Sequence, residues 1–251
     1  MRELPPPGWV DVIVVHDASQ SASNLVVTEA EERLAARRIT EERALRWRAA
    51  RGLMRLVASK YLGCEPLEVP ITLAPCVICG EPHGKPVLAD SPVHINLSHT
   101  QNTVMVGIAA SPVGVDVEPG PSGRDWLKLS GRFYSPAEAE WVREAGPVQA
   151  GTRFLRLWVR KEAVLKATGE GLPGGLETVP VLGAGPLTVT RSVAGVTSPW
   201  TVADVDPATH PFAAVALEGE DCRLRVLALA DLDAAPTRVA LPPPRSPARP
   251  A

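Results

Sequence analysis

The sequence predicts an α+β fold, because helical and strand-like patterns are grouped along the chain instead of alternating as in parallel α/β sheets. The order of helices followed by strands occurs twice. This suggests two halves of similar architecture, although they share no evident sequence identity. The chain has 251 residues, of which 45% are hydrophobic and 22% charged, so it can bury a sizeable core.

The first part of the chain is expected to hold a buried strand, two helices and several short strands. Residues 9–16 are rich in valine, which is typical of a buried strand. Thr28 begins a capping-box pattern for a helix over 28–38. A second helix over 40–62 carries its apolar residues at three- and four-residue spacing. Short strands are then predicted at 69–73, 93–97, 103–110 and 113–118.

The second part of the chain repeats this order. The tetrapeptide that begins at Ser135 is a capping box with proline at the first helical position, and it predicts a helix over 137–145. A longer helix is predicted over 148–168, where two glycines soon follow. Four strand-like runs come next, at 187–191, 200–205, 212–217 and 223–229.

By length alone the chain is one large domain or two small ones. The grouping of elements divides it into an N-terminal α+β half over 1–112 and a C-terminal α+β half over 113–230. The remaining segment, 231–251, is rich in Pro, Ala and Arg and is expected to be a disordered tail.

Charge and hydropathy exclude several classes of function. The formal net charge is -2, whereas a general nucleic-acid binder is usually basic. No run approaches the roughly 18 apolar residues of a membrane span, and the first ten residues lack the apolar core of a signal peptide. We therefore expect a cytoplasmic protein with neither a nucleic-acid nor a membrane partner. Its four cysteines are too few for a disulfide scaffold.

The strand at 113–118 carries two carboxylates on one face. Strand side chains alternate, so Asp116 and Glu118 point away from the apolar face that Val115 and Val117 form. Two hard oxygen ligands with open neighbouring positions suit a magnesium ion shared with a phosphate. Taken alone, the pattern is more typical of a half-buried strand with a solvated acidic face.

The long second-half helix carries a second set of polar residues. Trp158, Glu162 and Lys166 are spaced by four and share one face. A Glu–Lys pair there could be a surface ion bridge worth about 0.3–0.5 kcal/mol. Against that reading, the chain has 21 arginines and 5 lysines, and two of the rare lysines, Lys161 and Lys166, lie in this short stretch.

Two polar segments lie in the first half. Lys85 follows a glycine in a turn, as in many phosphate-binding loops, although a solvated turn would look the same. Ser98 and His99 end a predicted strand. Because adjacent strand residues point to opposite faces, and no Gly-x-Ser-x-Gly motif is present, a serine hydrolase is not indicated.

Cys76 and Cys79 form a single Cys-x-x-Cys motif. With His83 or Cys64 they could bind zinc, but a second such motif is missing. A zinc knuckle and two free thiols both remain open.

Taken together, these motifs resemble the 4′-phosphopantetheinyl transferase superfamily in its larger, Sfp-like branch. The resemblance rests on the order and spacing of an arginine-rich second helix and the motifs CxxCGxPHGKP, INLSHT, VGVDVE, RFYSPAE and WVRKEAVLKATGEGL, between residues 46 and 172. It implies two similar α+β halves related by a pseudo-two-fold axis, with coenzyme A in the cleft between them. Since one chain would supply both sides of the cleft, a monomer is expected.

The resemblance implies a metal and catalytic centre. Asp116, Glu118 and Glu162 would be magnesium ligands, and Glu162 would also take the proton of the attacking serine. Lys166 would neutralise charge on the departing 3′,5′-ADP.

The resemblance also implies a coenzyme A site. Lys85, Ser98 and His99 would hold its phosphates, with Arg46 at the 3′-phosphate. Glu138, in the RFYSPAE motif, would support the active site.

The implied activity is transfer of the 4′-phosphopantetheine group from coenzyme A to a serine of an apo acyl or peptidyl carrier protein, with release of 3′,5′-ADP. Such carriers serve polyketide or nonribosomal peptide biosynthesis. Two alternatives stay open: a transferase dedicated to one synthase, and a non-catalytic zinc-knuckle interaction module.

Overall fold

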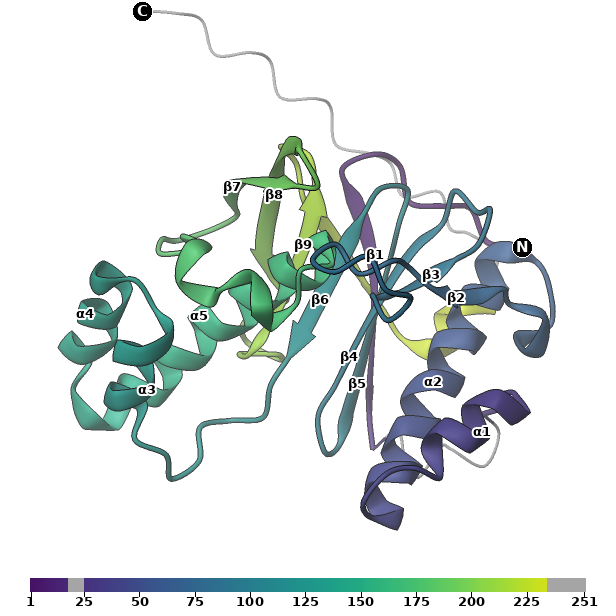
Figure 1. Ribbon diagram of the computed structural model, residues 1–251, viewed down its shortest axis with the longest axis horizontal. Helices are drawn as coiled ribbons and strands as arrows, with labels where there is room; N and C mark the ends of the chain where they lie inside the picture. The colour runs from purple at the N-terminus through teal and green to yellow at the C-terminus, as the bar shows by residue number, and fades with distance from the viewer. Residues whose placement is uncertain (18–24, 234–251) are drawn as a thin grey trace, which may run out of the picture.

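The computed structural model describes residues 1–17 and 25–233. Within them the chain forms five α-helices, two four-stranded sheets and a two-stranded hairpin (Figure 1). The predicted α+β class is confirmed. In this described part, no helix combines the length and the apolar character needed to cross a membrane.

The first sheet has the strand order β10-β1-β5-β4. Its strands are β1 (Trp9–His16), β4 (His94–His99), β5 (Thr103–Ala109) and β10 (Arg223–Leu227). The long helix α2 (Glu41–Leu62) packs on β4 and β5, and the short helix α1 (Glu29–Ala35) packs on α2. Strand β1 is buried on both faces: Ile13 belongs to the core under α2, and Val12 to a core shared with the second sheet.

The second sheet has the strand order β6-β9-β8-β7. Its strands are β6 (Val113–Val117), β7 (Leu187–Val193), β8 (Val196–Asp204) and β9 (Ala213–Glu218). The long helix α5 (Gly146–Thr168) lies across β6 and β9. Helices α3 (Trp126–Phe133) and α4 (Pro136–Glu144) pack on α5, so they form an outer layer at one end of the molecule (Figure 1).

Strands β4 and β6 join the two sheets through side chains. The Oδ1 of Asn96 accepts a hydrogen bond of 3.0 Å from the backbone N–H of Val115. The Oγ of Ser98 accepts one of 3.3 Å from the backbone N–H of Val117. Both polar side chains are buried. Residues 95–100, noted above for Ser98 and His99, therefore bring the end of β4 beside the acidic strand β6.

The remaining elements are short. Strands β2 (Ile71–Leu73) and β3 (Pro86–Leu88) form the hairpin whose connecting loop carries the Cys-x-x-Cys motif. Single turns of 3-10 helix occur at Pro66–Glu68, Leu172–Gly174, Leu176–Thr178 and Leu229–Leu232. The sequence analysis did not predict helix α3 or strand β3. The helices and strands that it did predict lie within a few residues of their observed positions.

Strand β10, near the end of the described chain, pairs with β1 near its beginning. This strand lies parallel to β1 in the first sheet, and Arg225 forms two hydrogen bonds of 2.7 Å with the buried carboxylate of Asp11. One strand of the predicted C-terminal segment thus completes the N-terminal sheet. The division into 1–112 and 113–230 stays a prediction. Of the expected tail, 231–251, the described residues are 231–233, and 234–251 lie outside the described part.

Candidate active site

Gly114 allows helix α5 to pass directly over strand β6. A Cβ atom at this position would overlap with the carbonyl oxygen of Ala163 and the backbone nitrogen of Ala167. The two contacted residues, Ala163 and Ala167, directly follow Glu162 and Lys166 in the helix. Backbone-to-backbone packing therefore holds both of these side chains beside the acidic face of the strand.

Asp116 is the most deeply buried carboxylate of this region, at 3% exposure. Its Oδ1 accepts hydrogen bonds from the Oγ of Ser98 at 2.9 Å and from the Nζ of Lys166 at 2.5 Å. Its Oδ2 is buried, and no described residue supplies it with a hydrogen bond. One oxygen of this carboxylate is thus held in place, while the other has no hydrogen-bond partner among the described residues.

Glu118 lies one residue beyond β6 and is held by an aromatic residue of α5. The Nε1 of Trp158 donates a hydrogen bond of 3.2 Å to its Oε1. The indole ring stacks on Phe154, at a centroid distance of 5.7 Å, and meets Phe133 edge-on. The sequence had placed Trp158 on the helix face of Glu162 and Lys166. Its contact with Glu118 depends on the packing of α5 on β6.

The carboxylates influence one another's protonation. Burial raises the pKa of Glu162 to about 7, and the negative charges of Asp116 and Glu118 act in the same direction against the opposing charge of Lys166. Burial, followed by the charge of Asp116, also raises the pKa of Glu118. A concentrated negative charge of this kind is relieved by a bound cation.

These three carboxylates fit a hard divalent cation by their chemistry. They offer oxygen ligands, which magnesium prefers, and the buried Oδ2 of Asp116 lacks a hydrogen-bond partner among the described residues. The carboxylates are less tightly gathered than a soft-metal set elsewhere in the described chain. That set is Cys76, Cys79 and His83, whose ligating atoms all lie within 4.8 Å of one another.

A group of cations lies at the end of β4. His99 is partly accessible to solvent. Its pKa is lowered first because nearby protein atoms displace part of its hydration, and then by the positive charges of Lys166, Arg46 and Arg38. Arg46, on α2, forms an ion pair of 2.7 Å with Glu42. His99 therefore lies within electrostatic reach of both Lys166 and Arg46, and an anionic ligand at this end of β4 would gain from these positive charges.

A cleft of about 470 Å³ lies between the β2–β3 loop, strand β4 and the end of α5. Lys85 and Lys166 both line it, whereas Arg46, Ser98 and His99 are not among the described residues that do. The Nζ of Lys85 donates a hydrogen bond to the carbonyl oxygen of Ala167. Burial lowers the pKa of Lys85 to about 8.

Glu138 lies apart from the carboxylates and binds a buried lysine. Its Oε2 accepts a hydrogen bond of 2.8 Å from the Nζ of Lys161, which also donates to the carbonyl oxygens of Leu176 and Val179. Its Oε1 accepts one from the backbone N–H of Val181. This network ties α4 and the 176–181 segment to the α5 residue next to Glu162. The rarity of lysine in the sequence had drawn attention to Lys161, but nothing in the sequence indicated that this side chain is buried.

Sequence comparison finds a family model and several characterised proteins that are similar to this chain. A family model described as the 4′-phosphopantetheinyl transferase superfamily matches residues 112–215. The 4′-phosphopantetheinyl transferase HetI of Nostoc sp. is 34% identical over 184 residues, which cover 71% of this chain and 73% of that protein. A 4′-phosphopantetheinyl transferase of Bacillus subtilis is 28% identical over 130 residues, covering 51% and 54%. The enzyme Sfp of Bacillus subtilis is 30% identical over 100 residues, covering 39% and 44%.

Proposed function

Because the chain belongs to the 4′-phosphopantetheinyl transferase superfamily, we propose that it transfers 4′-phosphopantetheine from coenzyme A to a serine of an apo acyl or peptidyl carrier protein. The second product is 3′,5′-ADP. The observation that carries the proposal is the packing of α5 on β6 at Gly114, which holds Glu162 and Lys166 beside Asp116 and Glu118.

Asp116, Glu118 and Glu162 would hold a magnesium ion, which when bound supplies positive charge beside the pyrophosphate of coenzyme A. Glu162 would accept the proton of the serine hydroxyl while the serine oxygen forms its bond to the phosphorus that bears pantetheine. The pKa of about 7 belongs to the metal-free protein; a bound cation would lower it and keep this carboxylate ionised, as a base near neutral pH requires. The bond from that phosphorus to the oxygen of 3′,5′-ADP breaks, and Lys166 would stabilise the charge that develops there.

We place coenzyme A along the cationic side of this centre. Lys85 in the cleft, together with Arg46 and His99 at the end of β4, would bind its phosphates, with Arg46 at the 3′-phosphate. The Oγ of Ser98 already donates to Asp116 and accepts from Lys166 and from the backbone of Val117. A hydroxyl has one donor and two acceptor positions, so Ser98 would act on phosphate through Lys166.

We also propose two halves, 1–112 and 113–230, related by a pseudo-two-fold axis with coenzyme A between them. In support, each four-stranded sheet is covered by one long helix, α2 or α5; β10 is the strand of the second segment that crosses into the first sheet. The cleft is lined from both segments. We further propose a monomeric, cytoplasmic enzyme whose partners are carrier proteins of polyketide or nonribosomal peptide synthesis, without a nucleic-acid or membrane partner.

The test is incubation of the purified protein with coenzyme A, magnesium and apo carrier proteins from several pathways, followed by intact-mass measurement. We expect the mass of one phosphopantetheine on a carrier, lost when its acceptor serine is changed to alanine or when magnesium is chelated. A single modified carrier would indicate a dedicated transferase. Absence of modification across fatty-acid, polyketide and peptide carriers would contradict the proposed activity.

A further inference from the structure

The loop between β2 and β3 is closed by its own backbone hydrogen bonds. The N–H of Ala74 donates to Lys85 O at 3.0 Å, and the N–H of Gly84 donates to Ala74 O at 2.9 Å. Nearer the tip, the N–H of Cys76 donates to Glu81 O at 2.8 Å. These bonds bring the beginning and the end of the loop together, so residues several positions apart face one another.

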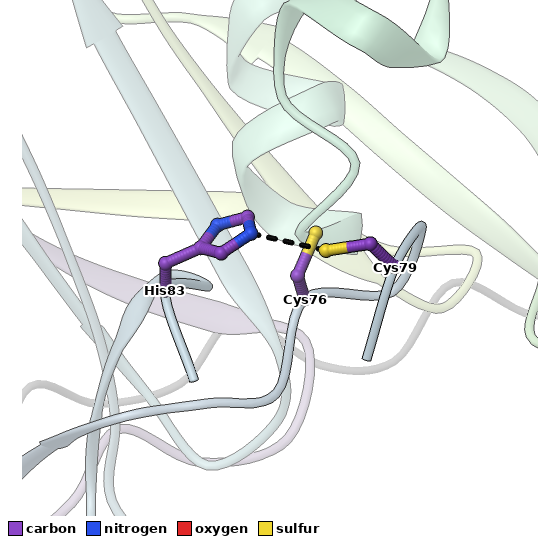
Figure 2. Close-up of side chains that lie close together, drawn as sticks. All are labelled: Cys76, Cys79 and His83. Carbon is purple, nitrogen blue, oxygen red and sulfur yellow. Dashed lines mark hydrogen bonds between the residues drawn. The ribbon is translucent and has the colours of Figure 1, made fainter. Parts of the chain in front are cut away.

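Three soft metal ligands converge in this loop. Figure 2 shows the two sulfurs and the imidazole of His83 directed toward one another, with a hydrogen bond of 3.0 Å between Cys79 Sγ and His83 Nε2. The ligating atoms of Cys76, Cys79 and His83 all lie within 4.8 Å of one another. A tetrahedral zinc site with bonds of about 2.0–2.3 Å places its ligand atoms about 3.6 Å apart, so this spacing needs only small movements.

The conformation of the Cys-x-x-Cys turn is held by its own backbone. Gly80, directly after the second cysteine, has φ of 79°, a conformation that strongly favours glycine. Its N–H donates to Cys76 O at 2.8 Å. The turn therefore holds both sulfurs on the same side, close to the imidazole of His83.

We propose that Cys76, Cys79 and His83 bind one thiophilic divalent cation, zinc, at a site separate from the carboxylates of β6 and α5. Two sulfurs and an imidazole select zinc over magnesium, which prefers oxygen. Cys64, the other ligand that the sequence allowed, is not part of the group within the described chain. Three protein ligands leave a fourth position for water.

The site stabilises one wall of the cleft. Cys76, Cys79 and His83 line it together with Lys85. A Cβ atom at Gly169, just after α5, would lie 3.6 Å from Val77 and 3.9 Å from the side chain of Lys85. The cation thus holds the loop that carries Lys85 in place against the end of α5.

The test uses tag-free full-length protein purified under reducing conditions without added metal. We expect about one zinc per chain by elemental analysis. Replacement of zinc by cobalt should give the thiolate-to-cobalt charge-transfer absorption in the near ultraviolet. Cys76→Ser and Cys79→Ser should each lose the metal and the absorption. Cys64→Ser, a half-buried thiol outside the group, is the matched control and should retain both.

His83→Gln tests the third ligand without removing a thiol. In competition with a chromophoric chelator, we expect its zinc affinity to fall at least tenfold, with an unchanged circular dichroism spectrum. Retention of wild-type affinity would remove His83 from the site. Two freely reactive thiols at Cys76 and Cys79 in the presence of zinc, or a disulfide between them under reducing conditions, would overturn the proposal.

A second measurement asks whether the metal acts on the cleft, and this step rests on the proposed function. With magnesium held at a fixed excess, calorimetry should show weaker coenzyme A binding in Cys79→Ser and in wild type stripped of zinc, with full affinity in Cys64→Ser. Equal coenzyme A affinity with and without zinc would refute the link to Lys85. If loaded wild type binds zinc but no coenzyme A, the proposed function fails while the zinc site stands.

Discussion

The Nζ of Lys166 on α5 lies 2.5 Å from Oδ1 of Asp116 on β6. The lysine is partly exposed and the carboxylate is buried, so the pair connects the cleft to the interior of the site. The same lysine also donates to the Oγ of Ser98 at 3.0 Å. Lys166 therefore compensates the charge of a proposed metal ligand and also lines the cleft in which we propose that coenzyme A binds.

Lys166→Met retains the apolar stem and removes the charge. We expect turnover to fall at least tenfold, because one stabilising charge at the transition state is lost. Magnesium affinity should not fall, since the cation can take over the charge of Asp116. Turnover and magnesium titrations check this, with Lys128→Met, an exposed lysine of α3, as control. Wild-type turnover in Lys166→Met would reduce the pair to a structural ion bridge.

Glu162→Gln should show an unusual dependence of stability on pH in the metal-free protein. The folded state raises the pKa of this carboxyl from 4.5 to about 7, so folded protein binds its proton more tightly than unfolded protein does. That stabilisation is present below pH 4.5 and is lost as pH rises through 7. Glutamine cannot ionise, so the variant should melt a few degrees above wild type at pH 8, with the difference shrinking as pH falls and vanishing below about pH 4.5.

The same variant should lose turnover by about a hundred- to ten-thousand-fold, the usual contribution of proton transfer. Thermal melts in chelator at both pH values, beside a turnover assay with magnesium, measure the two effects. Glu140→Gln, on the exposed face of α4, serves as control. A variant that melts below wild type at pH 8 would contradict the buried charge assigned to Glu162.

Gly114→Ala should displace α5 from β6. The added methyl group meets helix backbone, which cannot rotate away as a side chain would. Overpacking of this kind costs about 1–3 kcal/mol or more. We expect reduced stability to urea and a loss of turnover greater than the loss of folded protein. Gly131→Ala, on α3 with no described atom within 4 Å of the added methyl group, should leave turnover unchanged and should not lower stability, because alanine is the better helix former. Full activity in Gly114→Ala would disprove the close contact.

Lys161→Met should differ in kind from Lys166→Met. Lys161 is fully buried, and its removal leaves the buried carboxylate of Glu138 without its counter-charge. Loss of one partner of a buried pair costs about 3–5 kcal/mol. Chemical denaturation should show this loss, while protein that remains folded keeps most of its turnover. A stable but inactive Lys161→Met would instead place this lysine in the chemistry.

Local pattern in the sequence was enough for part of the site. Alternation along 113–118 separated Asp116 from the apolar valines, and four-residue spacing placed Glu162 and Lys166 on one helix face. The rarity of lysine directed attention to Lys85, Lys161 and Lys166. Each of these inferences concerns an element by itself, since the periodicity of a strand or helix depends only on its own backbone geometry.

Tertiary structure alone decided which faces meet. The close passage of α5 over Gly114, the parallel pairing of β10 with β1, and the bonds from Asn96 and Ser98 to the backbone of β6 all join residues distant in sequence. Periodicity tells which side of an element is apolar, but not which other element covers it. For the same reason the sequence could not distinguish Lys161 from Lys166. Tertiary packing buries Lys161 against Glu138 and leaves Lys166 at the cleft.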